Sequence, residues 1–271
     1  MMWDTGKAGS PVAPSRVYSA EAVVLRRTDL GEADRIVTLY TPRLGKLRAV
    51  AKGSRRPTSR LGGHLELFTH SRLLLARGRE LDIITQAETV SSFIGLRNDL
   101  WRATFAYYAA ELVDRLTVDR NPEPVVFDLL VQALDHIAVD RDPELALRFF
   151  ELQLFGALGF RPELYRCVRC EETLGPSGNF FSPSAGGVLC LICGQTEPSA
   201  RGLTTNAFKV LRLFQSGDYS TAARLSIDNP LRRELASVLE GYAEHLLERR
   251  IRSAELLAAL RASTPGQAST G

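Results

Sequence analysis

The stretch RIVTLYTPRLGKLRAVAK, residues 35–52, decides the fold of the amino-terminal third of the chain. Apolar or alternating runs lie on either side of Pro42 and Gly45, a pattern typical of short strands separated by a turn. Similar runs occur at 22–25, 65–75 and 81–85. Five short strands within roughly 75 residues favour a small barrel. An OB-type barrel fits best, because a short helix at 58–63 fits between the third and fourth strands.

After Gly95 the apolar residues recur every three or four positions, which predicts helices. Asn98 or Asp99 is a plausible cap for the first helix, and Asp142-Pro143-Glu144 has the composition of a helix start. The expected helices cover 100–116, 124–139, 142–158, 205–214, 221–226 and 229–260.

We therefore expect an α+β multidomain chain in which an OB-type barrel precedes a helical domain that carries a small cysteine-containing insert. The termini, rich in Gly, Ser, Pro and Ala, are expected to be flexible. The expected parts are a tail at 1–16, the barrel at 17–94, the helical domain at 95–165 and 200–262, the insert at 166–199 and a tail at 263–271.

The insert holds all four cysteines of the chain, in the pairs Cys167-x-x-Cys170 and Cys190-x-x-Cys193. Two intervening residues let a tight turn place both sulfurs about 2.3 Å from one metal ion, and a second such turn completes a tetrahedron. This spacing is typical of a four-cysteine zinc site. Four thiolates leave no open coordination position, so the predicted zinc ion is structural.

Three other interpretations of the paired cysteines stay open: a redox Cys-x-x-Cys motif, two disulfides and an iron–sulfur centre. A redox motif usually occurs once, after a strand and at the start of a helix, whereas this motif is doubled. The sequence has no apolar run of about 20 residues that would span a bilayer. Its amino terminus lacks a signal peptide, so we expect a cytoplasmic protein, in which close cysteine pairs more often bind metal than form disulfides.

The net charge of +3 is modest, but the stretch from Arg43 to Arg60 contains no Asp or Glu. Extended basic side chains at this pitch can contact successive phosphates, so we expect nucleic-acid binding there; a merely solvated basic face is the alternative. Tyr40 and Phe68 are candidate platforms for stacked bases, although each also fits a core position. The candidate DNA-binding residues are Arg43, Lys46, Arg48, Lys52, Arg55, Arg56 and Arg60.

The sequence lacks the common catalytic motifs, namely a phosphate-binding loop, a nucleophile elbow and an H-E-x-x-H helix. Asp29, Glu32 and Asp34 cluster in a loop, where like charges are usually solvated. We therefore expect no enzyme activity and no small-molecule substrate.

Six segments of the barrel region, together with the cysteine pairs after a helical stretch, form a recognisable pattern. These segments are 22–25, 30–35, 45–47, 51–56, 65–68 and 85–88. With them the sequence resembles the RecO family of bacterial DNA repair and recombination mediator proteins, in its zinc-bearing branch. The most specific parts are Leu30-Gly31-Glu32-Ala33-Asp34 and Ala51-Lys52-Gly53.

The resemblance implies an OB-fold, a helical domain and a zinc module. It also implies binding of single- and double-stranded DNA, annealing of complementary strands, and assistance to RecR in loading RecA onto DNA coated by single-stranded DNA-binding protein. The expected location is the cytoplasm, in association with the nucleoid. The basic stretches Arg232-Arg233 and Arg249-Arg250-x-Arg252 are loose candidates for contact with the acidic tail of single-stranded DNA-binding protein.

Two other functional classes remain as alternatives to a DNA-binding mediator. A zinc-ribbon transcription regulator would read duplex sequence through its helices, and a thiol–disulfide enzyme would use the paired cysteines. Measurements of salt dependence and sequence preference distinguish the transcription regulator from a mediator, because a mediator should bind any sequence with a steep salt dependence. Metal content and the redox cycling of the thiols distinguish the thiol–disulfide enzyme from a mediator.

Overall fold

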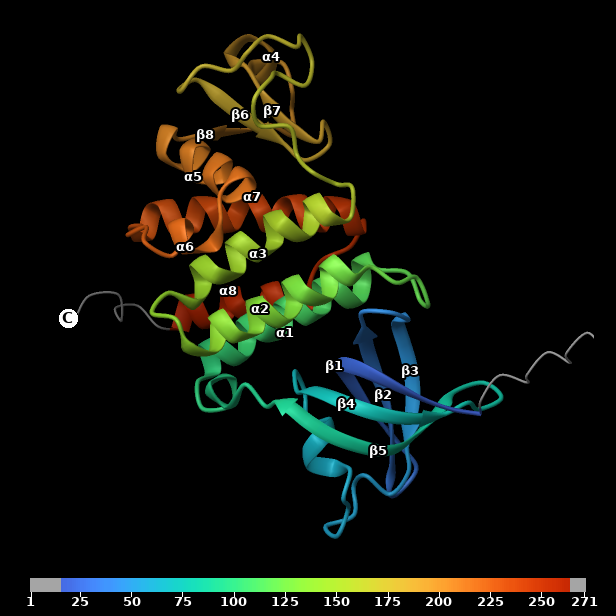
Figure 1. Cartoon of the computed structure of the whole chain (residues 1–271). Helices are drawn as coiled ribbons and strands as arrows, with labels where there is room; N and C mark the ends of the chain where they lie inside the picture. Colours follow the sequence, from blue (N-terminus) through green and yellow to red (C-terminus); the bar gives the residue numbers. More distant parts are fainter. Residues whose placement is uncertain (1–15, 264–271) are drawn as a thin grey trace, which may run out of the picture.

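A computed structural model describes residues 16–263 of the chain. Its amino-terminal part is a closed barrel of five strands (Figure 1). The strands are β1 (Val17–Leu30), β2 (Asp34–Thr41), β3 (Gly45–Ala51), β4 (His70–Ala76) and β5 (Asp82–Ser91). They follow one another around the barrel in the order β1-β2-β3-β5-β4, so the expected five-stranded barrel is confirmed.

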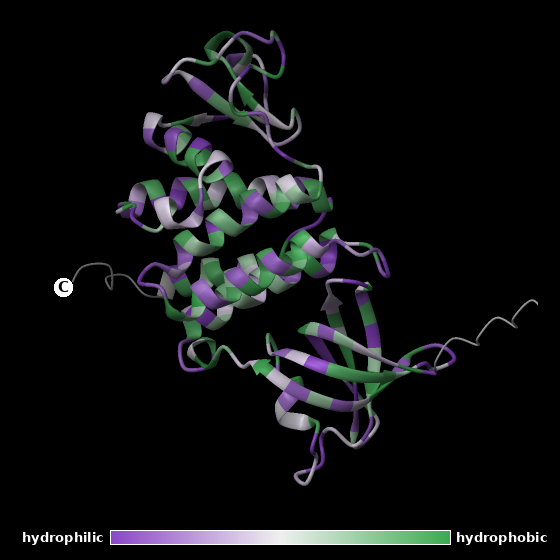
Figure 2. Ribbon diagram, viewed as in Figure 1, coloured by the Kyte–Doolittle hydropathy of each residue, from purple (hydrophilic) through white to green (hydrophobic). Residues whose placement is uncertain are grey.

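Closure of the barrel depends on one parallel pair, in which Ala49 of β3 lies opposite Asp82 of β5. The other neighbouring strands pair in antiparallel fashion. Side chains along β3 alternate between buried and more exposed positions, as the pleat of a strand requires. Figure 2 shows the corresponding alternation of hydrophobic and hydrophilic residues along the strands. The interior is filled by aliphatic side chains that include Val24, Val37, Leu39, Leu47, Leu73 and Leu75.

The segment between β3 and β4 differs from the expectation in two respects. The short helix is the 3₁₀ helix η1 at Gly62–Leu65 rather than at 58–63, and residues 66–69 form a turn instead of the start of a strand. Phe68 adopts a left-handed backbone conformation with φ 67°. Its ring is buried against Tyr107 of the following domain, with 4.9 Å between ring centroids. This tertiary contact overrides the apolar pattern that suggested a strand at 65–68.

Six helices of 12 to 19 residues stack beyond the barrel, preceded by the short 3₁₀ helix η2 (Ile94–Leu96) (Figure 1). Asp99 and Asp142 cap two of them as expected, because each carboxylate accepts backbone N–H groups of the first turn. The helices are α1 (Leu100–Leu116), α2 (Pro124–Val139), α3 (Pro143–Ala157), α5 (Thr205–Ser216), α7 (Asn229–Leu247) and α8 (Arg252–Ser263). The helical domain is therefore confirmed. No helix in residues 16–263 is both long enough and apolar enough to cross a membrane.

The carboxyl-terminal region is two helices, so the prediction of one helix over 229–260 was wrong. Glu248 ends α7 in a left-handed conformation with φ 52°, and Ile251 turns fully into the core. Glu111 of α1 then accepts hydrogen bonds from the backbone N–H groups of Arg252 and Ser253 at the start of α8. Burial of Ile251 and this cap reverse the chain so that α8 packs on α1. The helix expected at 221–226 is also displaced, to α6 (Tyr219–Ala222).

A buried ionic cluster lies where α1, α3, α7 and α8 meet. The guanidinium of Arg148 is fully buried and lies 2.8 Å from Glu151 and 3.0 Å from Glu240. Arg261 of α8 lies 3.5 Å from the same carboxylate oxygen of Glu240. Burial raises the pKa of Glu151 to about 7, although the charge of Arg148 opposes this rise.

The insert leaves the stack after α3 and returns at α5, at the end of the molecule remote from the barrel (Figure 1). It contains a three-stranded sheet of order β7-β6-β8 and one short helix. These elements are β6 (Asn179–Ser182), β7 (Gly187–Leu189), α4 (Leu191–Gln195) and β8 (Arg201–Leu203). Phe181 of β6 packs edge-on against Tyr242 of α7, so the sheet is joined to the helical core.

Candidate metal centre and nucleic-acid interface

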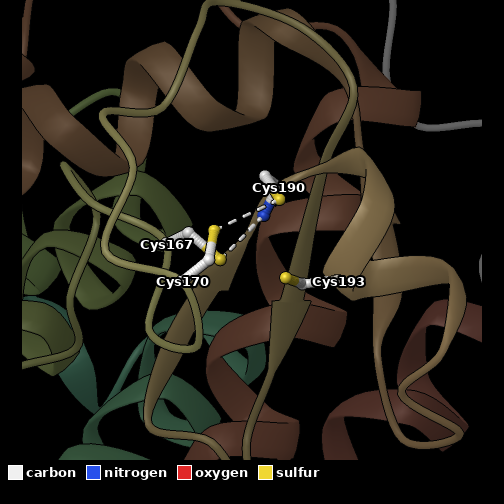
Figure 3. A group of neighbouring side chains, drawn as sticks. All are labelled: Cys167, Cys170, Cys190 and Cys193. Atoms are coloured by element: carbon white, nitrogen blue, oxygen red, sulfur yellow. Dashed lines mark hydrogen bonds between the residues drawn. The ribbon is translucent and has the colours of Figure 1, made fainter.

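The four cysteines converge from two segments of the insert. Cys167 and Cys170 lie in the loop that follows α3, Cys190 precedes α4, and Cys193 lies within it (Figure 3). All four sulfur atoms lie within 4.8 Å of one another, and the Sγ atoms of Cys170 and Cys190 are 3.8 Å apart. Sulfurs placed 2.3 Å from a tetrahedral ion are about 3.8 Å from each other. The cluster is therefore close to the size that a bound ion requires.

Both cysteine turns have the same backbone closure. The N–H of Glu171 donates to the carbonyl of Cys167 at 2.9 Å, and the N–H of Gly194 donates to that of Cys190 at 2.8 Å. Gly194 is required at its position, because a Cβ atom there would lie 2.5 Å from the ring of Phe180. The spacing and the glycine thus place the two pairs locally, and the β6–β7 hairpin brings them together.

The four thiols do not ionise alike in the absence of a cation. Burial raises the pKa of Cys167, but hydrogen bonds from the backbone N–H groups of Cys170, Cys190 and Arg169 outweigh it and lower the value to about 6. Burial and hydrogen bonds with neighbouring thiols raise the pKa of Cys193. A metal ion would neutralise the mutual repulsion of four thiolates, so this donor set can hold a metal ion with a closed coordination shell.

Six of the seven candidate DNA-binding side chains point into solvent, whereas Lys46 does not. The side chain of Lys46 is only 12% exposed. Its Nζ donates to the carbonyl oxygens of Asp114 and Thr117 and lies 3.4 Å from the carboxylate of Asp119. In return, its backbone carbonyl accepts a hydrogen bond from the N–H of Arg120. Lys46 therefore fastens the barrel to the α1–α2 loop and is not available to phosphates.

The remaining cations are divided between the two ends of the barrel. Arg43 lies in the β2–β3 turn, beside a groove of about 400 Å³ that is also lined by Glu21, His70 and Asp128. Lys52 follows the other end of β3, roughly 23 Å away for a seven-residue strand. The cations between Arg43 and Arg60 therefore do not form one continuous surface. Acidic side chains also border the groove beside Arg43.

The loop from Lys52 to Arg60 lies at the end of the barrel remote from the helices (Figure 1). Arg55 is fixed against the β1–β2 turn, with its guanidinium 3.1 Å from the carbonyl oxygen of Gly31 and 3.5 Å from Asp29. The side chains of Lys52, Arg56 and Arg60 are exposed, and no ion pair involves them within residues 16–263. These three cationic side chains are therefore accessible to an external anion.

Two arginines of the barrel were missed by the sequence analysis. Arg77 and Arg79 flank Gly78 in the β4–β5 turn, and both are exposed. This turn adjoins Arg48, because Arg48 shares a shallow depression of about 340 Å³ with Glu80 and Leu81. The sequence did contain a signal for these two residues, namely two arginines in a turn of the expected barrel. The loop between the fourth and fifth strands borders the binding face of OB-folds.

Tyr40 and Phe68 are 0% and 4% exposed, so both belong to the core and neither can stack on a base. The core interpretation of these two residues is thereby confirmed.

Comparison with known proteins gives matches along nearly the whole chain. A family model described as "Recombination protein O N terminal" matches residues 16–93, and one described as "Recombination protein O C terminal" matches residues 97–255. The chain is 45% identical to "DNA repair protein RecO" of Roseiflexus sp. (strain RS-1) over 254 residues, which are 92% of this chain and 89% of that protein.

Proteins of the same name from other bacteria show similar coverage. That of Symbiobacterium thermophilum is 39% identical over 91% of this chain and 99% of its own length. That of Dehalococcoides mccartyi (strain CBDB1) is 36% identical over 90% of this chain and 96% of its own length. The barrel, the helical domain and these matches agree: the chain belongs to the RecO family of recombination proteins, and its role is in DNA repair.

Proposed function

We propose that this chain is a non-catalytic recombination mediator that binds single- and double-stranded DNA and anneals complementary strands. In this role it helps RecR load RecA onto DNA coated by single-stranded DNA-binding protein. In the proposed division of the chain, DNA is held by the barrel at 17–94 and the insert is held by zinc. The insert extends past the expected bounds of 166–199, because β8 (Arg201–Leu203) pairs with β6 and completes its sheet.

The exposed cations of the Lys52–Arg60 loop are the observation that carries this proposal. Lys52, Arg56 and Arg60 project from a loop whose backbone is fixed by Arg55 and by a 2.7 Å hydrogen bond from Gly53 N–H to Asp34. A fixed loop presents its charges at low entropic cost, and phosphates that bind them release counterions. No base-reading geometry is needed for such binding, which suits a protein that acts on any sequence.

Arg48 extends the proposed interface along β3, and Arg77 and Arg79 extend it to the β4–β5 turn. Glu80 and Asp119 lie beside Arg48, so the positive potential is weaker there than at the Lys52–Arg60 loop. The loop is therefore proposed as the principal DNA contact, and Arg48 with the β4–β5 turn as its continuation.

Zinc is the proposed occupant of the cysteine cluster. Four sulfur donors in tetrahedral proximity favour zinc over hard cations that prefer oxygen ligands. The ion would link the loop after α3 to the start of α4, and hence stabilise an insert too small to have a large core of its own. Cys167, Cys170, Cys190 and Cys193 are its proposed ligands.

The acidic tail of single-stranded DNA-binding protein is the proposed ligand of a basic turn. Arg249 and Arg250 are exposed between α7 and α8, and Arg252 is exposed as the first residue of α8. Arg250 lies 3.9 Å from Glu255, but its side chain stays 83% exposed. Arg232, by contrast, is engaged with Asp142 at 2.6 Å and is withdrawn from this proposal. A transcription regulator finds no support in the family membership, and α4 has only five residues with which to read a groove.

An annealing assay with complementary labelled oligonucleotides tests the proposal. The wild type should accelerate annealing of bare and of protein-coated strands, while Lys52→Gln/Arg56→Gln/Arg60→Gln should not. Arg72→Gln is the one-charge control for the single variant Arg56→Gln, because Arg72 is an exposed arginine on β4 whose charge is paired with Glu88. Equal annealing by the triple variant would refute the proposed interface, and absence of annealing by the wild type would refute the function.

A further inference from the structure

The four cysteines of the cluster differ in their exposure to solvent. Cys167 is 1% exposed and accepts a hydrogen bond from the backbone N–H of Cys190 at 3.4 Å. Cys170 is exposed, whereas Cys190 and Cys193 are half-buried. Burial shields a sulfur from solvent, so Cys170 is the sulfur most accessible to an attacking reagent.

A second thiol is placed to complete a reaction begun at Cys170. The Sγ atom of Cys190, on the opposite cysteine turn, lies 3.8 Å from that of Cys170 (Figure 3). A disulfide needs about 2.05 Å, so a movement of less than 2 Å by two side chains in surface turns brings the sulfurs to bonding distance. Such a bond would remove two of the four ligands from the proposed metal.

We infer that Cys170 is an oxidation site for neutral hydroperoxides, with Cys190 as the resolving thiol; this rests on the proposed zinc. The Cys170 thiolate attacks one peroxide oxygen, the O–O bond breaks, and the products are a sulfenic acid and, after protonation, water. The Cys190 thiolate then attacks the Cys170 sulfur, and the displaced hydroxide takes a proton to give a second water. The two sulfurs lose two electrons, which reduce the peroxide, and Zn²⁺ leaves.

The charges beside Cys170 select the class of oxidant. Glu171 and Glu172 are both exposed and follow Cys170 directly, and no basic side chain pairs with them within residues 16–263. Arg169, on the other side of Cys170, is paired with Glu197 at 2.8 Å, so its charge is offset. The negative charges of Glu171 and Glu172 therefore repel anionic oxidants such as glutathione disulfide but not hydrogen peroxide. The helical core should survive the reaction, because Phe181 and Tyr242 hold the sheet of the insert independently of the sulfurs.

The first experiment treats the purified full chain with stoichiometric hydrogen peroxide. We expect release of one Zn²⁺ per chain to a chromogenic chelator, a protein mass lower by about 2 Da besides the metal, and reversal by dithiothreitol with added zinc. Digestion after arginine and glutamate separates Cys167, Cys170 and the pair Cys190 and Cys193 onto three peptides. Fragmentation should locate the new bond between Cys170 and Cys190.

A bond within either Cys-x-x-Cys pair, or no release of zinc by excess peroxide, would overturn the inference. If the purified chain contained no zinc, the proposed zinc site would be wrong. The peptide map would still show which thiols form a disulfide. As a variant that keeps all four ligands, Glu171→Gln/Glu172→Gln should accelerate zinc release by glutathione disulfide severalfold and leave the peroxide rate unchanged. The barrel variant Glu80→Gln/Glu88→Gln is its charge-matched control, and equal acceleration in both would refute the selection by charge.

Discussion

The charge of the Lys52–Arg60 loop can be removed without disturbing the fold. Lys52, Arg56 and Arg60 form no ion pair or side-chain hydrogen bond in the part of the chain that the structure describes. Replacement of all three by glutamine should therefore leave the free energy of unfolding unchanged within about 0.5 kcal/mol, as for other surface substitutions. Any loss of DNA binding then reports contacts with DNA rather than unfolding.

The expected magnitude follows from counterion release. Each phosphate contact with single-stranded DNA contributes about 0.7 to the slope of log K against log salt concentration, so three contacts contribute about 2. Between 50 and 200 mM salt the wild type should therefore lose about 20-fold more affinity than the triple variant. Arg56→Gln alone should lower the slope by about 0.7.

Fluorescence anisotropy of a labelled oligonucleotide, titrated at four or more salt concentrations, measures these slopes. Arg72→Gln serves as the one-charge control for Arg56→Gln and should leave the slope unchanged, because its side chain is paired with Glu88. Oligonucleotides of unrelated sequence should give the same slopes. A triple variant with the slope of the wild type would show that the loop is only a solvated face, and the proposed interface would be wrong.

Three other perturbations test different parts of the structure. Lys46→Met should lower stability by about 2–4 kcal/mol in chemical denaturation, because it leaves buried acceptors unpaired, yet should not alter the salt slope; an altered slope in a stable variant would return Lys46 to the DNA interface. Cys170→Ser should reduce the bound metal measured by mass spectrometry and lower the melting temperature, whereas a variant with full metal content would contradict the ligand assignment. Glu151 has a folded pKa of about 7, above its unfolded value, so its contribution to stability is present below about pH 4.5 and is lost as the pH rises through 7. The unfolding free energy of the wild type should accordingly fall relative to that of Glu151→Gln over this range, and parallel pH profiles would refute the raised pKa.

The cysteine cluster is the part of the site that the sequence predicted best. Two residues between cysteines close a tight turn whatever surrounds it, and both turns have the same backbone hydrogen bond in the structure. The identity of the ion and the assignment of its ligands remain predictions. The barrel was equally predictable, because alternation and turn residues are local signals.

The nucleic-acid interface shows what one-dimensional patterns omit. Lys46 and Arg48 occupy the same face of β3, yet the α1–α2 loop covers Lys46 and leaves Arg48 exposed. Arg43 is close to Lys52 in sequence, but a full strand separates them in space. Asp114, which helps to cover Lys46, lies 68 positions away in the sequence, and no local pattern reports such a contact.

The sequence by itself thus determined the element types, the cysteine turns and the family resemblance, since each depends on residues within a few positions or on a linear motif. Tertiary structure alone decided the burial of Tyr40 and Phe68, the break between α7 and α8, and the placement of the buried Arg148. These features depend on contacts between distant segments, which compete with local propensity and prevail because burial of apolar surface and satisfaction of buried polar groups involve larger free energies.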